Sequence, residues 1–121
     1  MKIAIWLDDY RDPNLSTWRD LIEHMAPEAE SVVWVKEGEA FRAAVEGTEE
    51  VVAIFFDNDL GFGVEEGRAL FNWFEEYVHL NGHPRTFLYA QTANPYARKE
   101  MRAGFRALDG YWNSLAEVED E

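Results

Sequence analysis

Residues 51–59 read VVAIFFDND, an unbroken apolar run that ends abruptly in acidic and amide side chains. A second run of the same kind, KIAIWLDD, occupies residues 2–9. Strands of nearly continuous apolar character are typical of parallel sheets that helices cover on both faces. Residues 2–7 and 51–56 are therefore predicted to be the central pair of strands in a parallel sheet.

The rest of the chain supplies two more strands and four helices. Residues 31–35 (SVVWV) and 86–90 (TFLYA) are β-branched and aromatic runs that favour strands. Between the strands, apolar residues recur at helical spacing. The four stripes are Leu15, Trp18, Leu21, Ile22 and Met25; Phe41, Ala44 and Val45; Leu70, Phe71, Phe74, Tyr77 and Val78; and Met101, Phe105 and Leu108. This β-α-β-α-β-α-β-α order predicts an α/β fold, a doubly wound parallel sheet with right-handed crossovers.

The segment after Leu108 leaves two alternatives open. Gly110 is interpreted as the end of an element, and residues 110–115 (GYWNSL) fit either a fifth strand or an aromatic segment over the sheet edge. The sheet is thus expected to have four or five strands. Residues 117–121 (EVEDE) are expected to form a disordered acidic tail, so that one domain covers residues 1–116.

The composition narrows the classes of function. The 121 residues include 24 acidic and 11 basic side chains, a formal net charge of −13, and no cysteine. The lack of cysteine excludes disulfides, thiolate metal sites and a cysteine nucleophile, and so acidic a chain is not expected to offer an extended duplex nucleic-acid surface. The N-terminal apolar run is too short for a signal peptide or a membrane span. A cytoplasmic protein with no membrane partner is expected.

Acidic residues follow both predicted central strands: Asp8 and Asp9 after the first, Asp57 and Asp59 after the third. Ligands of open parallel sheets bind beyond the carboxyl ends of the strands, where the strand order reverses. Crowded carboxylates repel one another unless a cation neutralises them, and oxygen donors suit Mg²⁺ or Mn²⁺. We therefore predict a metal site at Asp8, Asp9 and Asp57. The alternative is that these residues cap helices or begin turns.

A phosphate partner is implied, because Mg²⁺ in proteins usually shares its coordination with substrate phosphate. The Asn94-Pro95 pair is typical of a helix start, whose free N–H groups attract anions. The predicted phosphate-binding residues are Thr92, Asn94, Arg98 and Lys99. Arg11, Lys36 and Arg68 are expected at the same edge of the sheet, where they would form a basic rim around the acidic residues. For each of these cations the alternative is an ordinary solvated side chain.

The tryptophans Trp6, Trp18, Trp34 and Trp73 are interpreted as core residues.

These residues resemble receiver domains, the CheY-like phospho-acceptor modules of two-component signalling. The shared features are an acidic pair after the first strand, an Asp after the third and a Thr after the fourth. The resemblance implies Mg²⁺ binding by Asp8, Asp9 and Asp57, phosphoryl transfer to Asp57, and a contact from Thr92. Receivers also place a Lys at the end of a fifth strand, and no Lys follows Lys99.

The sequence is more similar to a divergent branch, the cyclic-phosphate processing receiver domains. Its motifs L-D-D-x-R-x-P, D-H-D-L-G and H-S-x-N-P-x-x-R-x-x-M correspond to LDDYRDP (7–13), DNDLG (57–61) and QTANPYARKEM (91–101), with a Trp at position 18. The resemblance implies a receiver-like three-layer sandwich, with metal on Asp8, Asp9, Asp57 and Asp59 and phosphate on Arg98 and the helix start at Asn94. It also implies action on cyclic phosphates of nucleotides or RNA ends. Asn58 and Gln91 replace two motif histidines, the obvious general acid and base.

Three hypotheses for function remain. The first is a metal-dependent phosphoesterase-like enzyme, in which Asp57 or a water molecule attacks phosphorus and Asp59 assists proton transfer. The second is a non-catalytic module that binds a phosphorylated ligand or a protein partner. The third is an acidic interaction protein, such as an inhibitor of phage or mobile-element origin. The missing histidines favour the second and third hypotheses, and the retained acids with Arg98 favour the first and second.

Overall fold

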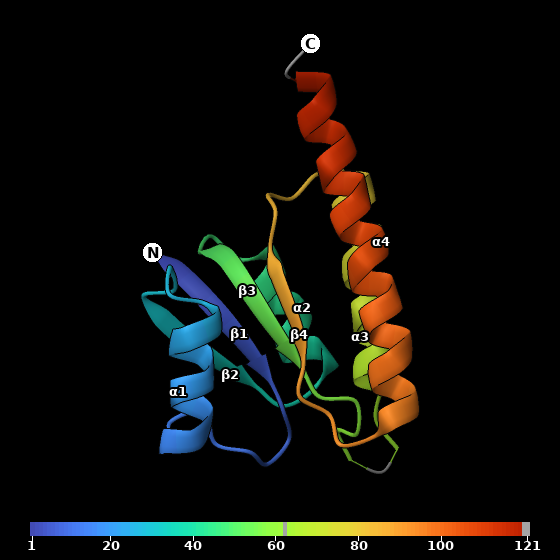
Figure 1. Ribbon diagram of the computed structural model, residues 1–121. Coiled ribbons are helices and arrows are strands. Elements are labelled where there is room, and N and C mark those ends of the chain that lie inside the picture. Colours follow the sequence, from blue (N-terminus) through green and yellow to red (C-terminus); the bar gives the residue numbers. More distant parts are fainter. Residues whose placement is uncertain (62, 120–121) are drawn as a thin grey trace.

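The computed structural model describes residues 1–61 and 63–119. Strands and helices alternate along this part of the chain, as predicted (Figure 1). In order they are β1 (Lys2–Leu7), α1 (Ser16–Met25), β2 (Ser31–Val35), α2 (Gly38–Glu46), β3 (Glu50–Phe56), α3 (Gly67–Asn81), β4 (Phe87–Ala90) and α4 (Pro95–Glu119). Each strand begins at the predicted residue or next to it.

The strands form one parallel sheet in the order β2-β1-β3-β4, which confirms β1 and β3 as the central pair. Leu7 lies opposite both Val35 of β2 and Phe56 of β3, so three strands end level with one another. The ladder continues one residue further, where Asp8 N–H donates to Val35 O (3.1 Å) and Asp57 N–H donates to Leu7 O (2.9 Å). Asp8 and Asp57 therefore leave the sheet side by side.

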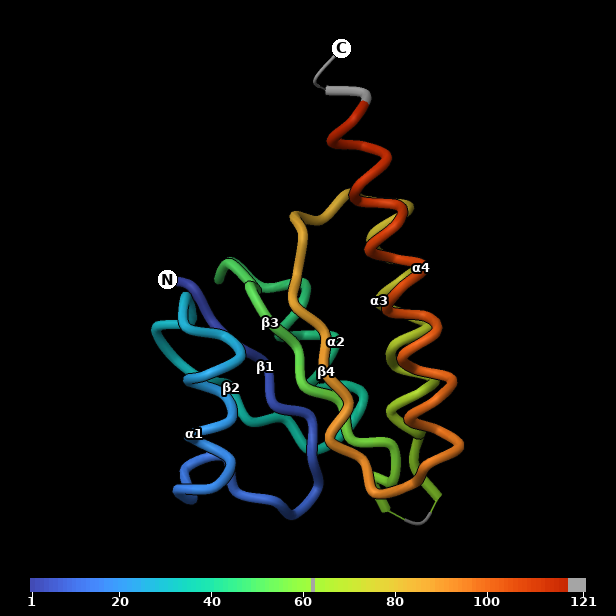
Figure 2. The backbone as a smooth tube through the Cα atoms, in the orientation of Figure 1, coloured from blue at the N-terminus to red at the C-terminus, as the bar shows by residue number. Residues whose placement is uncertain are grey.

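Helices cover both faces of the sheet, which gives three layers (Figures 1 and 2). Side chains of a strand alternate between the two faces, and β1 sends Ala4 and Trp6 toward α1 and Ile3, Ile5 and Leu7 toward the other helices. The α1 side is a small core of Ala4, Trp6, Ile22, Ala26, Ala53 and Phe55. The larger core, against α2, α3 and α4, includes Phe41, Ile54, Phe56, Leu70, Phe74, Met101 and Leu108. The predicted receiver-like sandwich is confirmed.

The C-terminal segment is helical, so the alternative of a fifth strand at residues 110–115 was wrong. Helix α4 runs without interruption through Gly110 to Glu119. Trp112 continues the apolar stripe of Met101, Phe105 and Leu108: it is buried, and its indole N–H donates to His83 O (2.9 Å). This burial outweighs the cost of a glycine inside a helix, about 1 kcal/mol. The described sheet thus has four strands, with β4 at an edge.

Residues 117–119, expected in a disordered tail, belong to α4, and residues 120–121 lie outside the described residues. None of the helices in the described ranges combines the length and the apolar character that crossing a membrane requires.

Candidate metal centre

Asp8 closes the loop that follows β1. Its side chain is fully buried, and Oδ1 accepts hydrogen bonds from the backbone N–H groups of Tyr10 (3.1 Å) and Arg11 (2.9 Å). Its second oxygen, Oδ2, accepts from the Arg11 guanidinium (3.1 Å). The alternative prediction, that these acids form turns, therefore holds for Asp8 Oδ1, whereas Asp8 Oδ2 faces the Arg11 guanidinium.

Two indole groups fasten this loop to the sheet. Trp6 N–H donates to Arg11 O (2.9 Å), and Trp34 N–H donates to Asp8 O (2.7 Å). The two tryptophans are neighbours in the β1–β2 register. The sequence alone predicts both only as core residues and does not show that they anchor this loop. The signal for that second role is that a buried indole needs an acceptor for its N–H. Here the loop that carries Asp8 and Asp9 supplies both acceptors.

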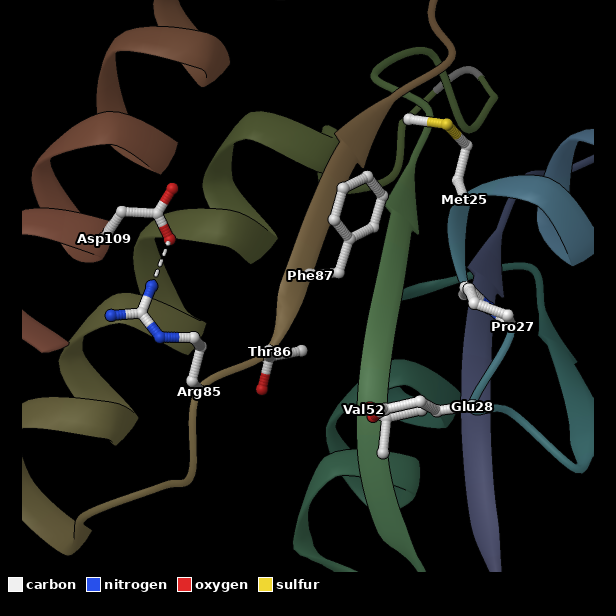
Figure 3. Close-up of a pocket in the computed structure, with 9 residues that line it drawn as sticks. Met25, Pro27, Glu28, Val52, Arg85, Thr86, Phe87 and Asp109 are labelled. Atoms are coloured by element: carbon white, nitrogen blue, oxygen red, sulfur yellow. Dashed lines mark hydrogen bonds and ion pairs between the residues drawn. The ribbon is translucent and has the colours of Figure 1, made fainter. Parts of the chain in front are cut away.

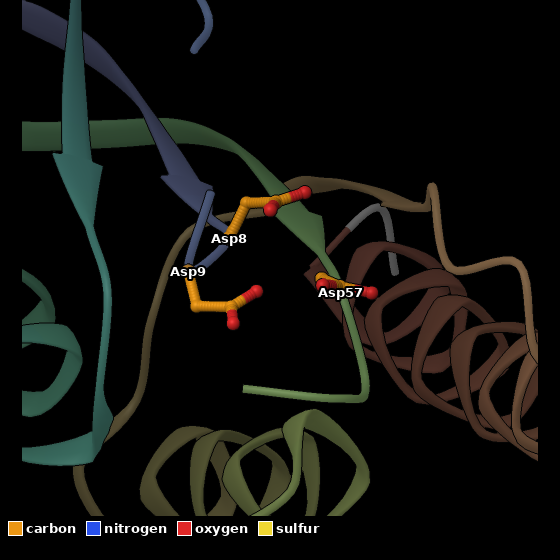
Figure 4. Close-up of side chains that lie close together, drawn as sticks. All are labelled: Asp8, Asp9 and Asp57. Carbon is orange, nitrogen blue, oxygen red and sulfur yellow. The ribbon is translucent and has the colours of Figure 1, made fainter. Parts of the chain in front are cut away.

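Asp8, Asp9 and Asp57 converge at the ends of β1 and β3 (Figure 4). One carboxylate oxygen from each residue lies within 4.8 Å of the others. Asp57 is buried, with Oδ1 accepting from Asn58 N–H (2.9 Å), whereas Asp9 Oδ1 is buried with no hydrogen-bond partner in residues 1–61 and 63–119. Asp59 is exposed and outside this cluster, although the family resemblance implied it as a fourth ligand.

Gln91 lies at the same edge of the sheet. Its backbone N–H donates to Phe56 O (3.0 Å) and its side-chain amide donates to Leu7 O (3.0 Å), so the side chain spans the ends of β3 and β1. Its Oε1 is buried without a partner among the described residues. Asn58 is buried too, and its Oδ1 accepts from Arg68 N–H (3.1 Å) at the start of α3. Gln91 thus adjoins the acidic cluster, and Asn58 holds a helix start.

A family model described as "Cyclic-phosphate processing Receiver domain" matches residues 3–107. The chain belongs to this family. The match runs from β1 well into α4, so it includes the acidic cluster and the segment of residues 91–101. The predicted resemblance is confirmed. No match was found among curated proteins or among solved structures.

The predicted phosphate-binding segment of this receiver domain begins α4. Thr92 is buried, and its hydroxyl accepts from Asn94 N–H (3.2 Å). Asn94 Oδ1 accepts from the N–H groups of Tyr96 and Ala97 (both 3.1 Å), which makes it the helix cap that the sequence predicted. Arg98 is half-buried and Lys99 exposed, and in the described chain neither forms an ion pair with the acidic cluster. Their phosphate binding stays a prediction.

The three cations expected on the rim differ in what they contact. Arg11 forms ion pairs with Asp8 (3.1 Å) and Asp57 (3.5 Å). Arg68 instead pairs with Glu66 and Glu100, and the Lys36 ammonium lies 4.4 Å from the ring centre of Trp34. Arg11 alone among the three reaches the acidic cluster.

A second feature of the surface is a hollow between α1, β3 and β4 (Figure 3). Met25, Val52 and Phe87 line it, and Arg85 and Asp109 pair beside it (3.5 Å). It lies near the N-terminal ends of β3 and β4, whereas the acidic cluster follows the C-terminal ends of β1 and β3. The hollow is therefore separate from the candidate metal site.

Burial raises the pKa of Asp57 from its ordinary value of 3.8 to about 6. The nearby charge of Asp8 acts in the same direction, and the charge of Asp9 adds to it more weakly. Arg11 and the Asn58 N–H act in the opposite direction, because both stabilise the ionised carboxylate. Without a further cation, the cluster therefore holds Asp57 partly protonated near neutral pH.

This shift predicts a pH-dependent stability of the metal-free domain. Because the folded pKa of about 6 exceeds the ordinary 3.8, the stabilisation from Asp57 is fully present below about pH 4 and is lost as pH rises through 6. We expect this group to reduce the free energy of unfolding by about 2–3 kcal/mol between pH 4 and pH 7. Urea denaturation in EDTA measures it as the difference between wild type and Asp57→Asn. A difference that stays constant over this range would contradict the assignment.

The donor set fits a hard divalent cation. Asp8, Asp9 and Asp57 offer only oxygen, and the Asp9 oxygen without a hydrogen-bond partner is available for a further interaction. With all three acids ionised and Arg11 beside them, the cluster carries a formal charge of −2, which one divalent ion balances.

Proposed function

We propose that this receiver domain binds Mg²⁺ or Mn²⁺ at Asp8, Asp9 and Asp57 and, with it, a cyclic phosphate of a nucleotide or RNA end. The observation that carries the proposal is the convergence of the three carboxylates within 4.8 Å at the carboxyl ends of β1 and β3. Membership of the cyclic-phosphate processing receiver family supports the ligand class. The strong negative charge of the chain opposes binding of an anion, and a divalent ion at the acidic cluster would offset it locally.

The bound ion would supply charge neutralisation and polarisation of the phosphate oxygens. The chain's own residues would orient the ligand. The start of α4 presents the positive end of a helix dipole toward this edge of the sheet, and Thr92, Asn94, Arg98 and Lys99 are the residues proposed to bind phosphate there. Asp57, which the resemblance to receiver domains implies as the acceptor of a phosphoryl group, is the acid proposed to face phosphorus.

Proton transfer is the weak part of the site. A positioned general acid or base contributes roughly 10²- to 10⁴-fold in rate, and an amide side chain cannot exchange a proton near neutral pH. Asn58 and Gln91 can therefore only orient groups and donate or accept hydrogen bonds. The carboxylate outside the acidic cluster that adjoins one of them is the exposed Asp59, whose Oδ1 accepts a hydrogen bond from the Asn58 amide (3.3 Å). We infer a domain that binds cyclic phosphates and opens them slowly or not at all.

This inference predicts weak or absent hydrolysis of 2′,3′-cyclic AMP by wild type in Mg²⁺, and a gain in turnover on restoring imidazoles. Gln91→His is the cleaner single variant, because the Gln91 side chain adjoins the cluster. Adding Asn58→His tests the second position, where an imidazole nitrogen can still accept the Arg68 N–H. We expect the double variant to raise turnover about tenfold or more, measured by chromatography of the ring-opened products.

Rapid ring opening by wild type, lost in Asp9→Asn, would show the expectation of slow turnover to be wrong. The domain would then be a working enzyme with a different arrangement of acid and base. Failure of wild type to bind the cyclic nucleotide at all in Mg²⁺ would overturn the proposed function itself.

A further inference from the structure

Arg11 contacts two of the three acids of the cluster, Asp8 and Asp57, and belongs to the same loop as Asp8 and Asp9. Its guanidinium contacts Asp8 Oδ2 (3.1 Å) and Asp57 Oδ2 (3.5 Å), and the side chain is 15% exposed. The ring centres of Tyr10 and Trp18 lie 5.0 Å and 5.7 Å from the guanidinium carbon. These aromatic contacts favour one position for a side chain that is otherwise flexible.

The backbone of Arg11 is fixed as firmly as its side chain. Its N–H donates to Asp8 Oδ1 (2.9 Å) and its carbonyl accepts from Trp6 (2.9 Å). The guanidinium is therefore held at the cluster by the turn that positions Asp8. Across the described residues, no other Lys or Arg comes within ion-pair distance of Asp8, Asp9 or Asp57.

The guanidinium retains donors for a ligand. Arginine has five N–H donors in a planar fork suited to phosphate oxygens, and the hydrogen bond of the Arg11 guanidinium to Asp8 uses one of them. A divalent ion on the three carboxylates would weaken their attraction for Arg11, because both cations compete for the same oxygens. A phosphate that approaches the ion then meets a second positive group at the same place.

We propose that Arg11 also binds the ligand phosphate directly. Its guanidinium bridges Asp8 and Asp57 in the metal-free protein and donates to a phosphate oxygen when the ion is bound. This rests on the proposed function, since it requires the ion at the acidic cluster. Arg11 thereby provides positive charge at carboxylates that no other Lys or Arg of the described residues reaches.

Calorimetry of two separate bindings tests the proposal: Mg²⁺ into the metal-free protein, and 2′,3′-cyclic AMP into the Mg²⁺-saturated protein. Arg11→Gln is expected to bind Mg²⁺ several-fold more tightly, because the formal charge of the cluster falls from −2 to −3. The same variant is expected to lose at least about tenfold in affinity for the cyclic nucleotide. Opposite changes in the two affinities are a signature that misfolding does not produce, because misfolding lowers both.

Two further variants complete the comparison. Arg11→Lys keeps the charge and loses the fork, so we expect nearly unchanged Mg²⁺ affinity and weaker binding of the nucleotide. Arg106→Gln, at an exposed position of α4, is the matched control and should change neither affinity.

The outcomes separate this inference from the proposed function. If Arg11→Gln binds the cyclic nucleotide as tightly as wild type, Arg11 is not the phosphate ligand, while the function stands. If Arg11→Gln and Arg11→Lys lose both affinities together, the role of Arg11 is structural and the inference is wrong. If wild type itself binds no Mg²⁺ or no nucleotide, the proposed function fails and the inference with it.

Discussion

Gly67→Ala should destroy the acidic site and much of the stability of the domain. A methyl group at this position would lie 1.7 Å from Asp57 O, 2.7 Å from Asp57 C and 3.0 Å from Asn58 Cα. All three are backbone atoms, so no side chain can move aside. The end of β3 and the start of α3 meet here without space for a Cβ, and Gly67 N–H also donates to Asn58 O (2.9 Å).

We expect Gly67→Ala to cost at least about 3 kcal/mol of unfolding free energy, the upper end of the usual range for overpacking. Because the displaced backbone carries Asp57, Mg²⁺ binding should fall as well. Thermal and urea denaturation measure the loss. Gly110→Ala is the matched control: its Cβ meets no atom within 4 Å in the middle of α4, and it should stabilise the domain by about 0.5–1 kcal/mol. A Gly67→Ala protein as stable as wild type would contradict the described approach of α3 to β3.

The second large effect concerns which acids hold the metal. Asp9→Asn should reduce Mg²⁺ affinity by about a hundredfold or more, since loss of a charged ligand exceeds the 10- to 100-fold effect of changing a supporting residue. Metal-free stability should stay the same or rise slightly, because Asp9 Oδ1 has no hydrogen-bond partner in the described chain and a like charge is removed. Trp6, whose indole binds the same loop, should report the titration by fluorescence.

Asp59→Asn is the control that distinguishes the metal ligands indicated by the structure from those implied by the family resemblance. The resemblance implied Asp59 as a ligand, whereas the structure leaves it exposed and outside the cluster. We expect the Mg²⁺ affinity of this variant to stay within about threefold of wild type, since only an exposed, screened charge outside the cluster is lost. Equal, large losses in Asp59→Asn and Asp9→Asn would show that the ligand set is larger than the three converging acids.

The sheet and the clustering of the acids were predictable because the same sequence feature determines both. The apolar runs of residues 2–7 and 51–56 mark central parallel strands, and acids that directly follow such strands must leave the sheet at one edge. The register of Leu7 opposite Phe56 then brings Asp8 and Asp57 together. Predicting the sheet and the acidic cluster therefore required no knowledge of long-range side-chain contacts.

The features that were not predictable depend on such contacts. Gly110 suggests a helix end, and only the packing of Trp112 against the His83 carbonyl shows why α4 continues. Arg11 reaches the cluster because Asp8 closes its own loop, and the two indoles that fasten this loop come from different strands. Asp59 is two residues from Asp57 in sequence, yet its side chain is exposed and lies outside the acidic cluster, which spacing alone does not show.

The most direct test of the central claim is calorimetric titration of 2′,3′-cyclic AMP into the wild-type domain, once with saturating Mg²⁺ and once in EDTA. The account predicts measurable binding with Mg²⁺ and none in EDTA, because three carboxylates without an ion repel a phosphate anion. Asp57→Asn should fail to bind the cyclic nucleotide in either condition. Equally tight binding in EDTA, or binding by Asp57→Asn equal to wild type, would contradict a metal-dependent phosphate site at Asp8, Asp9 and Asp57.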